Sequence, residues 1–246
     1  MNNRCGWITG AVIGLAAVIA SCVVAGAYKY KYKSQETVVV TGLGEQEFTS
    51  DQIVWRGWIY AQNTSAEAGY RELEQSREKV QEYIRAAGIP EESVVFMFTN
   101  MHKSYESIYS GGDYMGQRFT GYELNQSFTI ESKDHIEQVE EVSREISSLI
   151  AQGVQIESYQ PEYYYSKLDE MKLQLIEIAT ADARLRAEKI ASEAGARLKN
   201  LKNARMGVFQ ITGANTNEEF SAGGSFNTSS KDKKARITMR LEYTVR

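Results

Sequence analysis

Few residues of this chain have the type and spacing of a catalytic or metal site. The sequence holds two histidines, His102 and His135, and neither has a second histidine at HxH or HxxxH spacing. The two cysteines, Cys5 and Cys22, both lie within the first 22 residues. The rest of the chain therefore has no disulfide, no thiolate nucleophile and no cysteine-based zinc site. We predict no metal site.

Serine and carboxylate chemistry has no clearer sequence signal. There is no G-x-S-x-G motif, and Gly223-Gly224-Ser225 lies in a polar, low-complexity stretch. Acidic pairs such as Glu91-Glu92, Glu140-Glu141 and Glu218-Glu219 are typical of solvated faces. We expect no catalytic residues, no cofactor and a non-enzymatic role. The alternative is a hydrolase or ligand-processing enzyme whose acidic residues meet only in the folded chain.

Two glycines follow the first strand that the sequence predicts. Gly42-x-Gly44 comes after the β-branched run Thr37–Thr41, but no third glycine arrives at dinucleotide-binding spacing and no helix opens there. The pair is therefore neither a dinucleotide fingerprint nor a P-loop. We predict a turn or bulge between two strands.

Tyrosine is unusually frequent in two stretches of the chain. Tyrosine combines a large apolar ring with a polar tip, so a tyrosine-rich rim suits an interface. Strand residues on a half-solvated sheet explain the pattern equally well. The two stretches contain Tyr105, Tyr109, Tyr114 and Tyr122, and then Tyr159, Tyr163, Tyr164 and Tyr165.

Residues 5–28 form an uncharged run that could enter a membrane. As a helix the run would be about 36 Å long, enough to cross the hydrocarbon core. We favour an uncleaved anchor. Two cleaved forms remain open: an export signal cut after Ala25-Gly26-Ala27, and a lipoprotein in which Cys22 of Ile19-Ala20-Ser21-Cys22 is lipidated. Residues 1–33 are thus assigned to a membrane anchor or export signal.

Charge is divided unevenly between this segment and the body, residues 34–246. Residues 1–33 contain four cations and no acid, which leaves 24 cations against 32 acids, a net charge of −8, in the body. Because phosphate affinity comes largely from Lys and Arg, we expect no nucleic-acid partner. Counting cations on both sides of the run favours a cytoplasmic body, by a single charge.

Hydrophobic periodicity predicts an α+β body with helices packed on a mainly antiparallel sheet. Small residues recur every four positions at Ala179, Ala183, Ala187 and Ala191, so another element can approach this helix closely. We favour packing within the chain over an oligomer seam. The predicted parts are two strand–strand–helix units at residues 37–88 and 94–153, a loop at Tyr105–Thr120, a long Ala-rich helix at 168–194, a polar loop at Gly213–Lys234 and a C-terminal strand pair at Met206–Thr212 and 236–245.

Several short motifs, in order, resemble one known family. The stretch Val38–Glu45, followed by Asp51 and Trp55, is similar to the opening of the SIMPL domain, found in bacterial periplasmic immunogenic proteins and other envelope proteins. In the motif Gln152-Gly153-Val154, Val154 stands where the family usually has alanine. The further matches are Ala86-Ala87-Gly88-Ile89, Gly121-Tyr122, Gln152-Gly153-Val154 and the Ala- and Arg-rich helix from Ala179 to Ala191.

The resemblance covers roughly residues 36–246 and carries its own expectations. Members of the family usually begin with a signal peptide or a single anchor, which implies an extracytoplasmic, periplasmic body and opposes the one-charge argument. The family has no agreed catalytic residues to transfer. It is associated with the cell envelope and stress tolerance, and it implies a homo-oligomer that contacts the membrane through residues 5–28.

Overall fold

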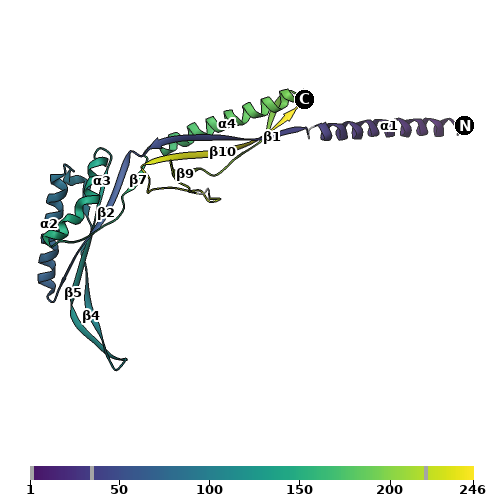
Figure 1. Ribbon diagram of the computed structural model, residues 1–246. Helices are drawn as coiled ribbons and strands as arrows, with labels where there is room; N and C mark the ends of the chain where they lie inside the picture. The colour runs from purple at the N-terminus through teal and green to yellow at the C-terminus, as the bar shows by residue number, and fades with distance from the viewer. Residues whose placement is uncertain (1–2, 34–35, 219–220) are drawn as a thin grey trace.

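The computed structural model describes residues 3–33, 36–218 and 221–246. Within these ranges the chain forms four α-helices and ten strands, and the strands make two antiparallel sheets (Figure 1). The α+β prediction is confirmed. A four-stranded and a six-stranded sheet take the place of one continuous sheet.

The four-stranded sheet joins the beginning of the body to its end. Strand β1 pairs with β10 along its whole length, with Val40 opposite Leu241. Helix α4 covers one face of this sheet, and the apolar side chains between them form one core. The elements are β1 (Thr37–Thr49), α4 (Leu168–Glu193), β8 (Leu198–Met206), β9 (Gln210–Gly213) and β10 (Asp232–Val245).

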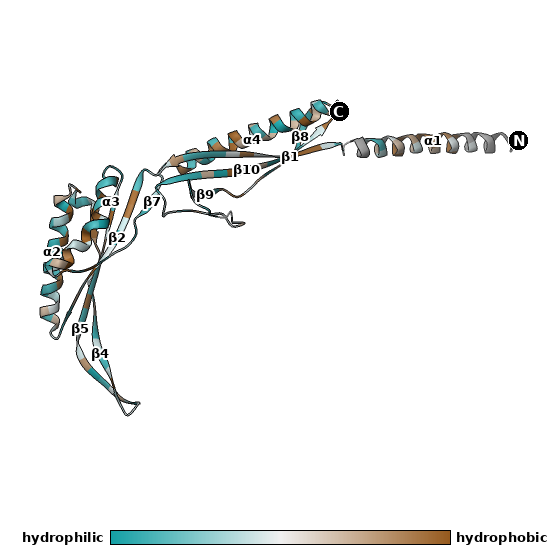
Figure 2. Ribbon diagram, in the orientation of Figure 1, coloured by the Kyte–Doolittle hydropathy of each residue, from teal (hydrophilic) through white to brown (hydrophobic). Residues whose placement is uncertain are grey.

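The six-stranded sheet carries the second core. Trp55 and Phe128 are fully buried, with their rings edge to face at 5.3 Å, and one section of β2 is strongly hydrophobic (Figure 2). The elements are β2 (Gln52–Asn63), α2 (Ala66–Ala86), β3 (Val94–Phe96), β4 (Asn100–Ser110), β5 (Asp113–Ser132), α3 (Ile136–Glu145), β6 (Gln155–Ser158), β7 (Glu162–Tyr164) and the 3-10 turns Glu91–Ser93 and Ile146–Gln152.

The two strands of the first predicted unit do not pair with each other. β1 belongs to the four-stranded sheet and β2 to the six-stranded one, and only Ser50 and Asp51 separate them. The Asp51 carboxylate accepts hydrogen bonds from the backbone N–H of Ser166 at 2.7 Å and from its hydroxyl at 2.6 Å. This contact fixes the link between the sheets to the start of α4.

The prediction of a turn at Gly42 and Gly44 is wrong, because β1 continues through both residues to Thr49. Both glycines face α4. A Cβ at Gly42 would lie 2.2 Å from the carbonyl oxygen of Ala179, and one at Gly44 would lie 2.3 Å from that of Leu175. The predicted small-residue stripe is buried, and Ala179 and Ala183 face Gly42 within the same chain. Glycine and alanine together let the strand lie directly on the helix.

Helix α4 also protects the free edge of β1. The backbone N–H of Leu43 donates to the Asp182 carboxylate at 2.8 Å. Arg186, one turn further along, pairs with the same carboxylate at 2.9 Å. The Arg186 hydrogen bond and then the Leu43 N–H lower the pKa of Asp182 below its usual value. An unpaired strand edge is a site of unwanted pairing, and this side chain blocks part of it.

The N-terminal run is a single helix, α1 (Asn3–Lys33). It continues without a break through Cys22 and Ala25–Ala27. Its segment Val12–Tyr30 is long and apolar enough to cross a membrane, a property that signal sequences near an N-terminus share. The predicted apolar helix is thus present, and its retention or cleavage belongs to the proposal below.

Candidate interaction surfaces

A long hairpin projects from the six-stranded sheet (Figure 1). β4 and the first part of β5 pair with each other, and β5 meets β2 only from Tyr122 onward. Gly111 and Gly112, with φ values of 61° and 94°, form the turn at its tip. The prediction of a loop at Tyr105–Thr120 is therefore wrong: these residues form a paired ribbon. We call residues 100–122 the arm.

The arm exposes more large apolar side chains than its own two strands can cover. Tyr109 and Met115 are each 65% exposed. The rings pair along the ribbon, Tyr105 with Phe119 at 5.8 Å and Tyr109 with Tyr114 at 5.8 Å, but each keeps an open side. The exposed set is Met101, Tyr105, Ile108, Tyr109, Tyr114, Met115 and Phe119. Such a patch is typical of a docking surface.

The second tyrosine stretch has a different role. The backbone N–H of Tyr163 donates to Thr228 at 2.7 Å, and the ring of Tyr165 packs on Phe48 at 4.8 Å. Burial, followed by a hydrogen bond to Glu140, raises the pKa of Tyr163 to about 12. The backbone of Tyr163 and the ring of Tyr165 thus link the end of β7 to Thr228 and to Phe48 of β1, while Tyr159 remains exposed. Only the first of the two predicted tyrosine surfaces is therefore an exposed arm.

A lysine is buried where the two sheets meet. Lys233 lies on β10, the residue is only 2% exposed, and its Nζ donates to the carbonyl oxygen of Tyr163 at 2.5 Å. Burial lowers the pKa of Lys233 to about 8, although the nearby charge of Glu218 opposes this shift. Glu218 also accepts hydrogen bonds from Asn227 and from the backbone of Gly213. Glu219, its partner in the predicted acidic pair, lies outside the described residues.

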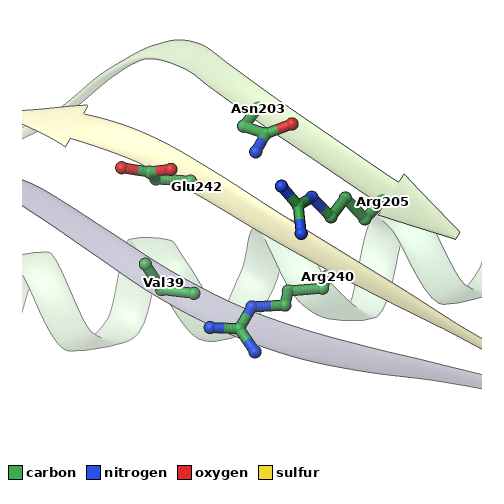
Figure 3. Close-up of a pocket in the computed structure, with 5 residues that line it drawn as sticks. All are labelled: Val39, Asn203, Arg205, Arg240 and Glu242. Atoms are coloured by element: carbon green, nitrogen blue, oxygen red, sulfur yellow. The ribbon is translucent and has the colours of Figure 1, made fainter. Parts of the chain in front are cut away.

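A hollow of about 280 Å³ opens on the face of the four-stranded sheet opposite α4 (Figure 3). Arg205 on β8 and Arg240 on β10 stand directly opposite each other in the strand register. No short motif in the sequence marks these two residues, which lie 35 positions apart. The hollow is lined by Val39, Asn203, Arg205, Arg240 and Glu242.

The structure does not bring His102, His135 or Cys22 into a shared site. His102 is exposed on β4 opposite Glu123, His135 precedes α3, and Cys22 is exposed on α1. Across residues 3–33, 36–218 and 221–246, no three His, Cys, Asp or Glu side chains are grouped so that they could hold a metal ion.

Comparison with solved structures gives only weak likenesses. A de novo designed protein, Ferredog-Diesel, is 18% identical, and the match covers 46% of this chain and 87% of that one with a TM-score of 0.20. An uncharacterized conserved protein from Listeria innocua is 10% identical over 80% of this chain and 92% of its own, again with a TM-score of 0.20. No curated protein sequence matches this chain.

A family model gives the informative match. The model for SIMPL, described as a protein of unknown function (DUF541), matches residues 38–245. This range begins one residue into β1 and ends at the last residue of β10, so it includes both sheets and the arm. The resemblance drawn from the short motifs is confirmed. The chain belongs to the SIMPL family.

Proposed function

We propose that this chain is a membrane-anchored protein of the cell envelope that acts, without enzymatic activity, by self-association through the arm. In this proposal α1 stays in the membrane and the body lies outside the cytoplasm. Cleavage of α1, or lipidation at Cys22, would release or re-anchor the same body. The link to envelope stress tolerance rests on the family resemblance alone.

The exposed arm is the observation that carries this proposal. A two-stranded ribbon is only marginally stable in water without a further surface to cover it. Here residues 104–121 pair only with each other among the described residues, and their aromatic rings remain open to solvent. A partner that covers these rings would stabilise the ribbon and bury the apolar area that folding leaves exposed.

Charge favours a second copy of the chain as that partner. The body carries a net charge of −8, so two copies repel each other at most approaches. The arm carries Lys103 and Arg118 against Glu106 and Asp113, and its net charge is zero. Arg118 and Glu106 already pair across the ribbon at 2.5 Å. The arm is thus an apolar and neutral surface on an acidic body, where two copies can meet with little repulsion.

We expect the full-length chain to run as a discrete multimer in a neutral detergent, measured by light scattering. Tyr109→Ser combined with Tyr114→Ser should weaken association by about 100-fold or more, because buried tyrosines at interface centres each contribute about 2 kcal/mol. Tyr70→Ser is the matched control, since Tyr70 is 50% exposed and lies on α2, outside residues 100–122.

Two results would contradict this proposal. One is a wild-type chain that stays monomeric over a wide concentration range. The other is a multimer whose dissociation constant is the same with and without the arm tyrosines. In the second case the chain would still self-associate, but through a surface other than the arm.

A further inference from the structure

The open face of the four-stranded sheet places two arginines in an unfavourable arrangement. Arg205 and Arg240 are exposed and directly opposite each other on adjacent strands. Side chains in such a pair are separated by only about 5 Å at their Cβ atoms, and like charges there destabilise a sheet. Figure 3 shows both guanidinium groups on the face of the sheet that α4 leaves uncovered.

The other cations on this face are paired. Lys234 lies 3.1 Å from Glu47, and Arg236 lies 2.5 Å from Glu45. Among the residues that the structure describes, neither Arg205 nor Arg240 lies within ion-pair distance of a carboxylate, and the charge of Arg240 acts on Glu242 only as the smallest of the causes that lower its pKa. The carboxylate in the hollow belongs to Glu242. It lies 2.9 Å from the Lys202 ammonium group, and this hydrogen bond is the largest of the causes that lower the pKa of Glu242.

We propose that this hollow binds a phosphate group between Arg205 and Arg240. Two guanidinium planes supply several N–H donors in a geometry that suits a phosphate oxygen pair, and the anion would remove the repulsion between them. The Asn203 amide lies at the rim and provides a further donor, while Val39 forms an apolar wall (Figure 3). The charge of Glu242, compensated by Lys202, leaves the hollow cationic on an otherwise acidic body.

The phosphate could belong to a lipid headgroup or to a phosphate ester in solution, and the position of the hollow close to α1 in the chain makes the lipid accessible. Val39 comes six residues after Lys33, the end of α1. Six residues span at most about 20 Å, so an inserted α1 keeps the hollow within reach of lipid headgroups. A phosphate ester in solution offers the same chemistry. The proposed phosphate site depends only on the geometry of the four-stranded sheet. The lipid source alone depends on the proposed membrane anchoring.

The test uses the full-length chain in a neutral detergent with inorganic phosphate as the probe. Isothermal titration calorimetry measures the binding. Arg205→Gln and Arg240→Gln should each weaken phosphate binding by about tenfold or more, since each removes a charge-assisted contact. Lys199→Gln is the matched control, because it removes one exposed cation from the same strand, β8, outside the hollow.

The second arm of the test distinguishes the two sources. The chain is placed in phosphatidylcholine nanodiscs with and without phosphatidylglycerol, in phosphate-free buffer, and its Tm is measured. A rise in Tm with phosphatidylglycerol that both arginine variants lose, and Lys199→Gln keeps, identifies a lipid headgroup. Calorimetric binding of inorganic phosphate with the same variant pattern, but with no rise in Tm on adding phosphatidylglycerol, identifies a soluble source.

Three outcomes would overturn the proposal. The first is no response to inorganic phosphate or to phosphatidylglycerol. The second is an equal loss in Lys199→Gln, which would indicate diffuse attraction to a charged surface. The third comes from anion-free buffer, where relief of repulsion should leave Arg240→Gln at least as stable as the wild type. A clearly lower Tm there would mean that the arginine is needed for the fold.

Discussion

Replacement of Gly42 by alanine is expected to lower the free energy of unfolding of the body by about 3 kcal/mol, near the upper end for an overpacked core. The added Cβ would lie 2.2 Å from the carbonyl oxygen of Ala179 and 2.4 Å from the backbone nitrogen of Ala183. Both atoms belong to the backbone of α4, so no side-chain rotation can relieve the clash. The helix has to move away from the sheet, which opens the core that they share.

Urea denaturation followed by circular dichroism measures this loss. Thr41→Ala is the control: Thr41 is on the same strand, but it is exposed and its side chain is turned away from Gly42's face. Gly44→Ala should repeat the effect, because its Cβ would lie 2.3 Å from the carbonyl oxygen of Leu175. If Gly42→Ala unfolds at the same urea concentration as Thr41→Ala, the close packing of β1 on α4 is not a source of stability.

The sequence predicts the individual elements better than their partners. Alternation along residues 236–245 identifies β10, and the four-residue spacing of alanines identifies the packed face of α4. The division into two sheets is not encoded in such local patterns. β1 pairs with β10, almost 200 residues later, and its neighbour in sequence, β2, pairs with β5. Nothing in the spacing of residues 37–60 distinguishes this arrangement from a simple hairpin.

The two candidate surfaces differ in how visible they are in the sequence. The high tyrosine content of the arm is evident in the sequence. However, the glycines at its tip and the lack of a regular apolar alternation are typical of a loop. Its pairing becomes evident only when β4 is aligned with β5. Arg205 and Arg240 lie 35 positions apart and become neighbours only because β8 adds to the edge of β10. Periodicity shows which face a residue occupies; it does not show which strand lies beside it.

Burial of Lys233 is expected to make the free energy of unfolding rise with pH above about pH 8. The ammonium group of this lysine is taken out of water, and the acceptor that it finds among the described residues is the carbonyl oxygen of Tyr163 at 2.5 Å. Burial therefore favours the neutral amine and lowers the pKa from 10.5 to about 8. Below pH 8 the folded chain must hold a buried cation, and this lowers its stability.

The sign follows from proton binding in the two states. Between about pH 8 and 10.5 the folded chain has released the Lys233 proton and the unfolded chain still holds it. Stability must therefore rise with pH in this window, by about 3 kcal/mol in total, because each pKa unit corresponds to about 1.4 kcal/mol. Tyr60 and Tyr163 have pKa values raised to about 12, so they reduce stability only above about pH 10.

The comparison of wild type with Lys233→Met isolates this lysine from every other titrating group. Methionine has a similar length and no charge, so the variant should lose the rise between pH 8 and 10 while keeping the decline above pH 10. At pH 7 its stability should be close to that of the wild type, because removal of the buried charge offsets the lost hydrogen bond to Tyr163. Lys199→Met, at an exposed position, should follow the wild-type curve. Parallel urea-denaturation curves for wild type and Lys233→Met from pH 7 to 10 would mean that Lys233 stays charged, with water reaching it between the two sheets.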